Sequence, residues 1–475
     1  MIRQACQDSS DPHSCVSDFQ TECDRDAGRR DPAWVLGAAV KTTIGEARRA
    51  IETVSSLTTL SNEIREQIAI RDCMELLDMS VEELGASMAE LQRIQPGGPP
   101  RNARREENLK AWLSAALGNQ DTCIEGFEAT DGRIRNSITG SLRQVTRLVS
   151  NVLAEFKRVV TIRPSFPSNR TVGSEFPTWI GEEERGLVRM EPGMMHVDAV
   201  VAQDGSGRYQ TIMAAVEEVP DHGERRYVIY VKRGVYRENV ELKKKKSNIM
   251  MVGEGMGLTV VSSGRNFLQG WTTYRTATFA VSGRGFIARD MTFRNTAGPG
   301  NRQAVALRVD SDRSAFFRCS IEGYQDTLYA HSLRQFYRDC NIHGTITITA
   351  QGRKDPNQAT GFSIQKSFVY ATVPTYLGRP WKPYSRTVFM QTYMSGLVRP
   401  EGWLEWAGNF GLNTLYYGEY TNYGPGAGTG GRVRWAGYHA IRDARVAAMF
   451  TVRRFIDGGS WLPSTGVIFT AGLTK

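Results

Sequence analysis

The stretch Cys319-Ser320-Ile321-Glu322-Gly323 has a counterpart further along the chain, Cys340-Asn341-Ile342-His343-Gly344. A related stretch, Met291-Thr292-Phe293, precedes Cys319-Ser320-Ile321 by a similar interval. Short strands that recur at steps of twenty-odd residues are typical of a solenoid, in which equivalent side chains stack coil upon coil. We therefore predict an all-β parallel β-helix. A β-sandwich is the alternative, but it would need hairpin turns, and Asn-Gly or Asp-Gly pairs are scarce here.

Two regions of different periodicity flank a proline-containing stretch. After Val197 the sequence predicts short strands over 227–231, 249–252, 278–281, 287–293, 304–309, 316–321 and 336–342. Earlier in the chain, apolar residues recur every three or four positions over 40–68, 73–91, 108–117 and 138–156. That spacing predicts an all-α four-helix bundle. We expect a helical domain over 1–162, an extended linker over 163–192 and a β-helix domain over 193–475.

Charge is divided unevenly between these regions. Residues 190–475 hold 35 Lys and Arg against 22 Asp and Glu, a net charge of +13, whereas residues 1–189 carry −4. A basic half favours a polyanionic ligand, and without a recognisable nucleic-acid module the candidates include acidic polysaccharide as well as DNA or RNA. The run Lys243-Lys244-Lys245-Lys246 could contact such a polymer, but a run of like charges is more often a solvated turn.

Several features favour an extracellular protein. Cys6 and Cys15 are close enough in sequence to link a hairpin, while Cys73 and Cys123 could join two helices; free buried thiols are the alternative. Asn169-Arg170-Thr171 is a glycosylation sequon. No run of about 18 apolar residues predicts a membrane span, and residues 1–6 lack the apolar region of a signal peptide. We expect a secreted protein whose signal segment is not present in this sequence.

Asp326 is the strongest catalytic candidate. An Asp beside a Gln, here Gln325, often only caps a strand end. This pair stands between two β-rich runs, where polar groups are either hydrogen-bonded or functional, and Gln303 and Arg308 come from the same neighbourhood. The chain has no Gly-x-Ser-x-Gly, HExxH or CxxC motif, and Gly253-x-Gly255-x-Gly257 lacks the βαβ setting of a nucleotide loop. We therefore expect carboxylate chemistry without a cofactor.

Five motifs give the second half, from about Val197 to Leu473, a specific resemblance to the plant pectin methylesterases. They are Gly234-Val235-Tyr236-Arg237-Glu238, Gln303-Ala304-Val305-Ala306-Leu307-Arg308, Gly323-Tyr324-Gln325-Asp326-Thr327-Leu328, Leu377-Gly378-Arg379-Pro380-Trp381 and Trp461-Leu462-Pro463-x-Thr465-Gly466. The first half resembles the inhibitor-like pro-region of that family, including its four cysteines at 6, 15, 73 and 123.

This resemblance implies a fold, an activity and partners. The implied fold is a right-handed, single-stranded, pectin lyase-like parallel β-helix preceded by the helical bundle. The implied activity is hydrolysis of methyl esters of cell-wall homogalacturonan to pectate and methanol, without a metal or cofactor. The implied partners are pectin and the chain's own inhibitor-like domain, with no nucleic acid. Cys6, Cys15, Cys73 and Cys123 are implied to form disulfides.

Roles for individual residues also follow from the resemblance. Asp326 matches the general acid that later acts as a base. Gln303 and Gln325 match the amides that hold the oxyanion, and each such hydrogen bond contributes roughly 3 kcal/mol. Arg379 matches the group that keeps the nucleophilic carboxylate ionised and oriented. Thr273 and Trp381 match substrate contacts.

The chain departs from the family at the nucleophile. The family reads Gly-Thr-Val-Asp-Phe-Ile-Phe-Gly after the coil of Cys340, whereas this chain reads Gly344-Thr345-Ile346-Thr347-Ile348-Thr349-Ala350. Thr347 stands at the Asp position, and a threonine hydroxyl needs a base, which none of the six histidines supplies in this stretch. We expect no nucleophile here. The family's partner for Cys340 also falls in the lost segment.

The missing segment is expected to be a whole coil. Cys340, Ser367 and Thr392 follow one another at coil-sized intervals along the chain. A solenoid that loses one coil should keep its stacking. Three hypotheses stay open: a pectinesterase without its nucleophile, a non-catalytic pectin-binding or inhibitory protein, and an ordinary esterase whose coil was lost in gene prediction.

Overall fold

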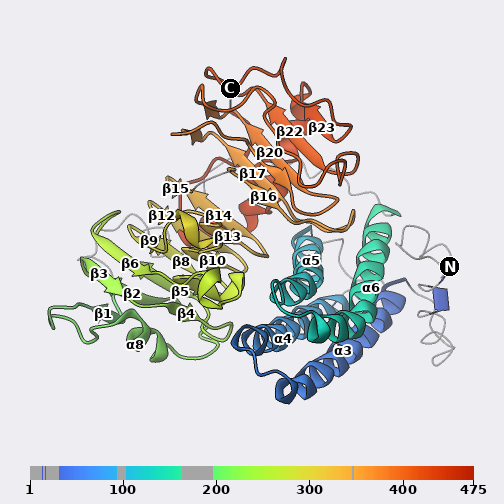
Figure 1. Ribbon diagram of the computed structural model, residues 1–475, viewed down its shortest axis with the longest axis horizontal. Helices are drawn as coiled ribbons and strands as arrows, with labels where there is room; N and C mark the ends of the chain where they lie inside the picture. The colour runs from blue at the N-terminus through green and yellow to red at the C-terminus, as the bar shows by residue number, and fades with distance from the viewer. Residues whose placement is uncertain are drawn as a thin grey trace. The chain divides into compact units, whose positions relative to one another are not determined.

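The computed structural model describes residues 13, 16–17, 32–93, 103–162, 196–344 and 347–474. The chain divides into two compact units (Figure 1). The first contains residues 1–172 with the short segments 270–274 and 355–359, and the second contains the rest. The expected linker 163–192, the sequon at Asn169 and the cysteines at 6, 15 and 23 lie outside the described residues.

The first unit contains a bundle of four long helices. They are α3 (Pro32–Ser56), α4 (Ile64–Gln92), α5 (Ala103–Glu125) and α6 (Arg133–Ile162), with the 3-10 helix η1 (Leu57–Leu60) between the first two. Their apolar stripes meet in a core that includes Val40, Leu77, Leu113 and Val149, none of them exposed. A disulfide between Cys73 and Cys123 joins α4 to α5 across a Cα separation of 4.4 Å. The predicted four-helix bundle is confirmed.

The second unit contains parallel sheets built from short strands. We call β1 to β15 the first stack. Its sheets have the orders β1-β2-β5-β8-β11-β14, β3-β6-β9-β12-β15 and β4-β7-β10-β13. Their bounds are β1 (Ala199–Val201), β2 (Tyr227–Val231), β3 (Gly234–Arg237), β4 (Val240–Leu242), β5 (Ile249–Val252), β6 (Thr259–Ser263), β7 (Phe279–Val281), β8 (Ile287–Arg289), β9 (Thr292–Asn295), β10 (Leu307–Val309), β11 (Ser314–Phe317), β12 (Ser320–Glu322), β13 (Leu328–Ala330), β14 (Gln335–Arg338) and β15 (Asn341–His343).

We call β16 to β23 the second stack. Its sheets have the orders β16-β19, β17-β20-β22-β23 and β18-β21. The bounds are β16 (Ala350–Gln351), β17 (Phe362–Gln365), β18 (Phe368–Val369), β19 (Arg379–Pro380), β20 (Arg386–Met390), β21 (Tyr393–Met394), β22 (Tyr416–Tyr420) and β23 (Tyr438–Ala440). All pairs in both stacks are parallel, so the predicted parallel β-helix is confirmed.

The register agrees with the repeats in the sequence. Ser320 pairs with Asn341 on one side and with Thr292 on the other, as the recurrence of the three motifs requires. The corner before each of these strands holds a residue in the left-handed region: Asp290 at φ 57°, Arg318 at 49° and Asp339 at 51°. The same corner recurs at Lys366 and Gln391 in the second stack, both at φ 51°. These five corners therefore turn with the same backbone geometry.

Aromatic side chains stack inside the first stack. Phe279 and Phe293 have ring centroids 4.7 Å apart, Phe293 and Phe316 are 6.2 Å apart, and Phe316 lies parallel to Tyr337 at 4.9 Å. Gly253 also has a packing role, because a Cβ at this position would lie 2.2 Å from the carbonyl oxygen of Asp290 in the next coil. The glycine thus permits close approach of two coils.

No strand pairing joins the two stacks among residues 196–344 and 347–474. β13, β14 and β15 are the last strands of their sheets, and β16, β17 and β18 begin new ones (Figure 1). The neighbouring side chains are left open, with Ile342 53% and Phe368 63% exposed. The prediction that loss of a coil leaves the stacking continuous is therefore wrong. In the part of the chain that the structure describes, the edge strands β13, β14 and β15 have no strand partner for their outward hydrogen bonds.

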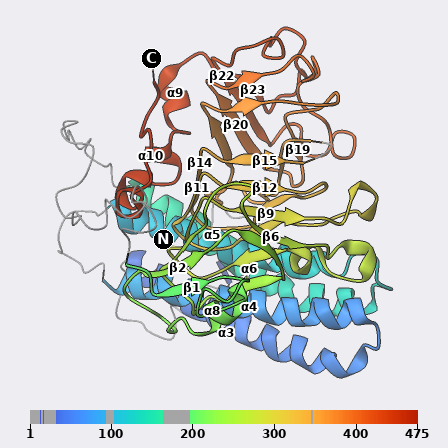
Figure 2. The ribbon, with the colours of Figure 1, turned by 90° about the vertical axis from the view of Figure 1, so that its left-hand side faces the viewer.

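The C-terminal tail packs on both stacks. It contains α9 (Ala444–Ala448), α10 (Val452–Phe455), η6 (Gly458–Ser460) and η7 (Leu462–Thr465). Phe450 packs with Val388 and Met390 of the second stack, whereas Trp461 packs with residues of β2, β5, β8 and β11 in the first. Figure 2 shows α9 beside β22 and α10 beside β11 and β14. The tail is thus a connection between the stacks.

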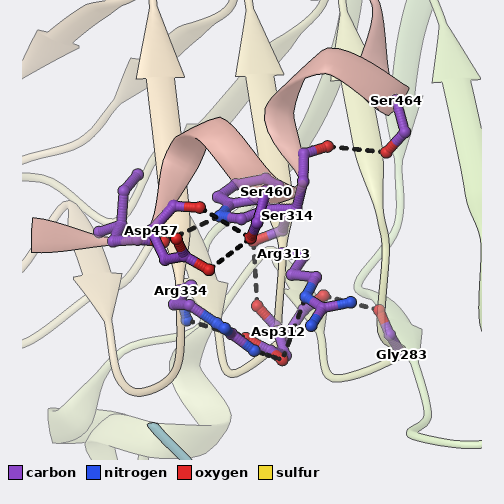
Figure 3. A network of polar contacts seen from close by, with 11 residues as sticks. Gly283, Asp312, Arg313, Ser314, Arg334, Asp457, Ser460 and Ser464 are labelled. Atoms are coloured by element: carbon purple, nitrogen blue, oxygen red, sulfur yellow. Dashed lines mark hydrogen bonds and ion pairs between the residues drawn. The ribbon is translucent and has the colours of Figure 1, made fainter. Parts of the chain in front are cut away.

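A buried ion pair links consecutive coils of the first stack (Figure 3). Arg334 donates from Nε and Nη2 to the carboxylate of Asp312 at 2.8 and 2.6 Å. Burial alone would raise the pKa of Asp312, but Arg334, helped by Arg313 and Arg284, outweighs it and lowers that pKa to about 2. The pair is thus ionised at neutral pH.

We predict that Arg334→Gln lowers the free energy of unfolding by about 3–5 kcal/mol, because it leaves the Asp312 carboxylate buried without its cation. The matched control is Arg318→Gln, which removes the bidentate pair with Asp290 at 2.7 and 2.8 Å from a side chain that is 48% exposed. That change should cost under about 1 kcal/mol. Urea unfolding at pH 7 measures both, and equal losses would contradict the prediction.

Candidate active site

Gln303, Gln325 and Asp326 lie together between the second and third sheets of the first stack. Gln303 and Gln325 form a parallel bridge, and the N–H of Ala304 donates to the Gln325 carbonyl at 3.1 Å. Asp326 follows directly, exposed and at φ 60°, a region that Asp tolerates better than most residues. The corner brings two amides and a carboxylate to one place on neighbouring coils.

The amide of Gln303 is only partly satisfied by the protein. Its Oε1 is buried, and no donor among the described residues reaches it. Rotation about the last side-chain bond exchanges the oxygen and the NH₂ of an amide, so this end can present either an acceptor or a donor. An amide of a half-buried residue whose oxygen has no donor is suited to hold a polar group of a ligand.

A cluster of charges lies on the adjacent sheet. The register places Glu241, Ala280, Arg308 and Tyr329 in one row across β4, β7, β10 and β13. Arg275 contacts Glu241 at 2.6 Å and Arg308 approaches it at 3.6 Å. Burial would raise the pKa of Glu241, but Arg275, Arg308 and Lys243 together lower it. The row combines an ionised carboxylate with cations beside the two glutamines.

Sequence reasoning named Arg308 but missed Glu241 and Arg275. Val240 and Leu242 are buried on either side of Glu241, so strand alternation could have placed this carboxylate on the outer face. Its partnership with Arg308 could not be predicted, because the steps between the paired residues along the chain are unequal.

The lysine run pairs with acidic side chains. Lys243 contacts Glu241 at 2.9 Å, and Lys245 and Lys246 contact Asp221 at 2.8 and 3.1 Å. These contacts favour the interpretation as a solvated turn over that of a polymer-binding patch.

Arg379 and Trp381 belong to the second stack. Arg379 begins β19, its N–H donates to Thr349 at 3.1 Å, and its guanidinium lies 4.6 Å from the ring centre of Trp406. Trp381 is half-buried after the same strand and donates its backbone N–H to Gln351 at 3.1 Å. Because β19 pairs with β16 and not with β13, none of the sheets formed by the described residues brings Arg379 and Trp381 together with Asp326.

The other candidates are placed as follows. Thr347 forms a bridge with Tyr376 in the second stack. Thr273 opens the 3-10 helix η4 (Thr273–Thr276) and belongs to the first unit. Asp339 is 54% exposed and pairs with Arg338 at 3.1 Å. Asp355 belongs to the first unit, where it accepts hydrogen bonds from Ser150 and from the Asn357 N–H.

Two surface clefts lie apart from these residues. One of about 370 Å³ is lined by Lys366, Phe368, Gln391, Tyr423 and Thr474, and the other, of about 410 Å³, by Ala202, Gln203, Asp204, Lys232, Arg233 and Glu254.

Within the described part of the chain, no three His, Cys, Asp or Glu side chains are grouped as metal ligands. None of the described helices is long and apolar enough to cross a membrane.

The fold is a parallel β-helix that carries two glutamines and an aspartate on one corner, and comparison with known sequences assigns the chain to a family. The sequence profile described as Pectinesterase matches residues 198–348 and 346–459. The profile described as Plant invertase/pectin methylesterase inhibitor matches residues 1–154. The chain therefore belongs to the pectinesterase family, in the form that carries an inhibitor-like domain.

Individual relatives agree with this assignment. One relative is pectinesterase/pectinesterase inhibitor 22 of Arabidopsis thaliana, which is 55% identical over 510 positions. The alignment covers 100% of this chain and 94% of the Arabidopsis chain. Pectinesterase/pectinesterase inhibitor PPE8B of Prunus persica is 47% identical, covering 96% and 92%. Among solved structures, the pectin methylesterase from carrot is similar with a TM-score of 0.59 and 48% identity, over 60% of this chain and 100% of its own.

One histidine beside the site gives a pH prediction. Burial lowers the pKa of His331 to about 4, with Asp310 opposing the shift and Arg308 adding to it. The folded pKa is below the unfolded value of about 6.5, so stability is fully present above pH 6.5 and is lost as pH falls toward 4. Between pH 6.5 and pH 4 this ring should lower the free energy of unfolding by about 3 kcal/mol, and the His331→Gln variant should not show that decrease. Urea titrations across that range measure it, and a ring that titrates near 6.5 by NMR would contradict it.

Proposed function

We propose that this chain binds methyl-esterified homogalacturonan in a pectinesterase-family site that keeps the acid and the oxyanion amides but lacks the attacking carboxylate. The observation that carries the proposal is the corner that contains Gln303, Gln325 and Asp326. This corner lies in the last coils of the first stack, just before the sheets end at β13, β14 and β15. The two-part match of the family profile, which meets at residues 346–348, supports a missing segment at the same place.

The residues present could stabilise the oxyanion and protonate the leaving group in ester hydrolysis. The backbones of Gln303 and Gln325 are paired on neighbouring coils, so their side-chain amides can donate to the carbonyl oxygen of one bound ester as negative charge develops there. Asp326 is exposed next to them and can give a proton to a leaving alkoxide. Arg379 and Trp381 would contact the polymer from the second stack. Thr273 is proposed as a further substrate contact.

Attack on the ester carbonyl requires a nucleophile. Thr347 stands here at the position of the family's aspartate. Asp326 cannot attack the ester and protonate its leaving group in the same step. The alignment with the Arabidopsis relative spans 510 positions against 475 residues, a difference of 35 that is large enough for a coil. We infer that turnover is close to background in this sequence, and that polymer binding is what it retains.

The helical domain has a proposed role in the same site. Its resemblance to pectin methylesterase inhibitors supports an intramolecular inhibitor-like partner for the β-helix domain. Its charge is of the opposite sign, which favours association. We propose secretion to the cell wall, consistent with the Cys73–Cys123 disulfide. A second disulfide between Cys6 and Cys15 is part of the same proposal.

A non-catalytic pectin-binding or inhibitory protein is the second candidate. The net charge of +13 on residues 190–475 favours it, because a polymer of carboxylates binds to such a surface without any chemistry. Sequencing the transcript across Thr345 to Thr347 separates both candidates from an ordinary esterase that has lost a coil in gene prediction.

We predict that methanol release from methylated pectin by the unmodified chain is near background. An oxyanion hole and binding alone leave roughly 10³ to 10⁴ over water in an unrelated hydrolase, which is small beside a complete enzyme. Insertion of an Asp-containing coil between Ile346 and Thr347 should restore turnover.

The matched control for that experiment carries the same inserted coil together with Asp326→Asn, and it should return to background. Cooperative unfolding of each variant checks that the inserted coil is folded. If the unmodified chain turns over at ordinary esterase rates, another carboxylate attacks, with Asp339 and Asp355 the nearest in sequence.

We also predict that polygalacturonate binding weakens steeply with salt. The Debye length falls from about 10 Å at 0.1 M to about 3 Å at 1 M, so charge attraction between the basic domain and the polymer is screened. Affinity electrophoresis at several salt concentrations measures this. Fully methylated pectin, which carries few charges, is the control: its binding relies on the contacts of the proposed site and should change little with salt. Salt-independent binding of polygalacturonate would contradict the electrostatic account.

A further inference from the structure

Cys319 and Cys340 occupy equivalent positions in the last two coils of the first stack. The residues that follow them, Ser320 and Asn341, are paired in register, and the N–H of Asn341 donates to the Cys319 carbonyl at 2.9 Å. Neighbouring parallel strands lie about 4.8 Å apart, and paired residues point to the same face. A disulfide needs Cα atoms about 4.4–6.8 Å apart, so this placement can accept one.

The side chains share one environment. Cys319 has no exposed surface and belongs to the apolar interior of the stack, and Cys340 packs against the same interior from a partly exposed position. Cys340 Sγ lies 3.4 Å from the carbonyl oxygens of Phe316 and Arg338, and Cys319 Sγ lies 3.5 Å from that of Phe317. Both thiols are free, and nothing in the proposed ester hydrolysis uses them.

Cys340 is also the more accessible and the more readily ionised of the two. β15 is the last strand of its sheet, and the residues that follow Cys340 are exposed, Ile342 by 53%. A hydrogen bond from the Cys319 thiol lowers the pKa of Cys340, and its neighbouring backbone helps, although burial opposes the shift. Burial raises the pKa of Cys319. An oxidant therefore meets Cys340 first.

We propose that Cys319 and Cys340 are a thiol–disulfide pair that a low-molecular-weight disulfide, such as oxidised glutathione, closes in the folded protein. The Cys340 thiolate attacks one sulfur of the oxidant, whose S–S bond breaks and releases one thiol. The Cys319 thiol then loses its proton, and its sulfur attacks Cys340 in the mixed disulfide and releases the second thiol. Two protein thiols lose two electrons in total, and the oxidised glutathione gains them.

The bond would join two coils where backbone pairing ends. β12 and β15 are the last pair of their sheet, so a covalent link between adjacent residues closes the open end of the first stack. Closure does not depend on ester hydrolysis or on polymer binding.

The test is a peptide map of the full chain after incubation with oxidised glutathione, followed by alkylation of remaining thiols and digestion without reductant. We expect the peptide of Cys319 linked to that of Cys340, with loss of two hydrogens and no alkylation of either. The Cys73–Cys123 link is the control within the same chain, because it should be present in every sample.

Variants identify the order of attack. Cys319→Ser should trap Cys340 as a mixed disulfide with glutathione, whereas Cys340→Ser should leave Cys319 reduced, because it is fully buried. Alkylation of the reduced native chain should modify Cys340 at least about 10-fold faster than Cys319.

Three outcomes would overturn the proposal. The first is that both thiols stay open to alkylation after unfolding while Cys73–Cys123 is intact. The second is a link from either cysteine to Cys6, Cys15 or Cys23. The third is an equal rate of alkylation at the two sites in the folded chain. The map of the unsubstituted chain decides the first two even if a serine variant fails to fold.

Discussion

Backbone hydrogen bonds between successive coils are the interaction on which this β-helix depends. Each strand has only a few residues, so it gains its partners from the coil before it and the coil after it. Where a coil is absent, as between β15 and β18, both neighbours lose those partners at once. Ile342 and Phe368 become exposed for the same reason. One internal loss thus creates two open ends inside a single chain.

The C-terminal tail compensates for part of this loss. Its aromatic and aliphatic residues cover the outer faces of sheets in both stacks, with Phe450 on one and Trp461 on the other. The amides of Gln365 and Gln391 add hydrogen bonds to the tail backbone at Gly472 and Thr474. Packing of side chains on a sheet does not require the coils themselves to be adjacent, which is why the tail can bridge what the strands cannot.

The sequence predicted the bundle and the β-helix because both depend on local periodicity. The recurrence of the motif at 291–293, 319–321 and 340–342 appears directly as the register of Ser320 with Thr292 and Asn341. The interruption could not be predicted from that recurrence, since the spacing from Cys340 to Ser367 is coil-sized although β15 and β18 are unpaired. Periodicity reports the length of a coil but not whether its neighbour is present. Similarly, Gln303 and Gln325 belong to motifs that are visible in the sequence, whereas the pairing of Glu241 with Arg308 depends on an irregular register.

The same interruption explains why the candidate site is divided. In a continuous β-helix the residues of one sheet follow each other coil by coil, so a carboxylate, its amides and an arginine from different coils form a single row. Here the amides and Asp326 belong to the first stack, and Arg379 and Trp381 belong to the second. In the proposed function, the absent coil would have supplied both the strand partners and the nucleophile. Under that proposal, loss of stacking and loss of the attacking group are two consequences of one change in sequence.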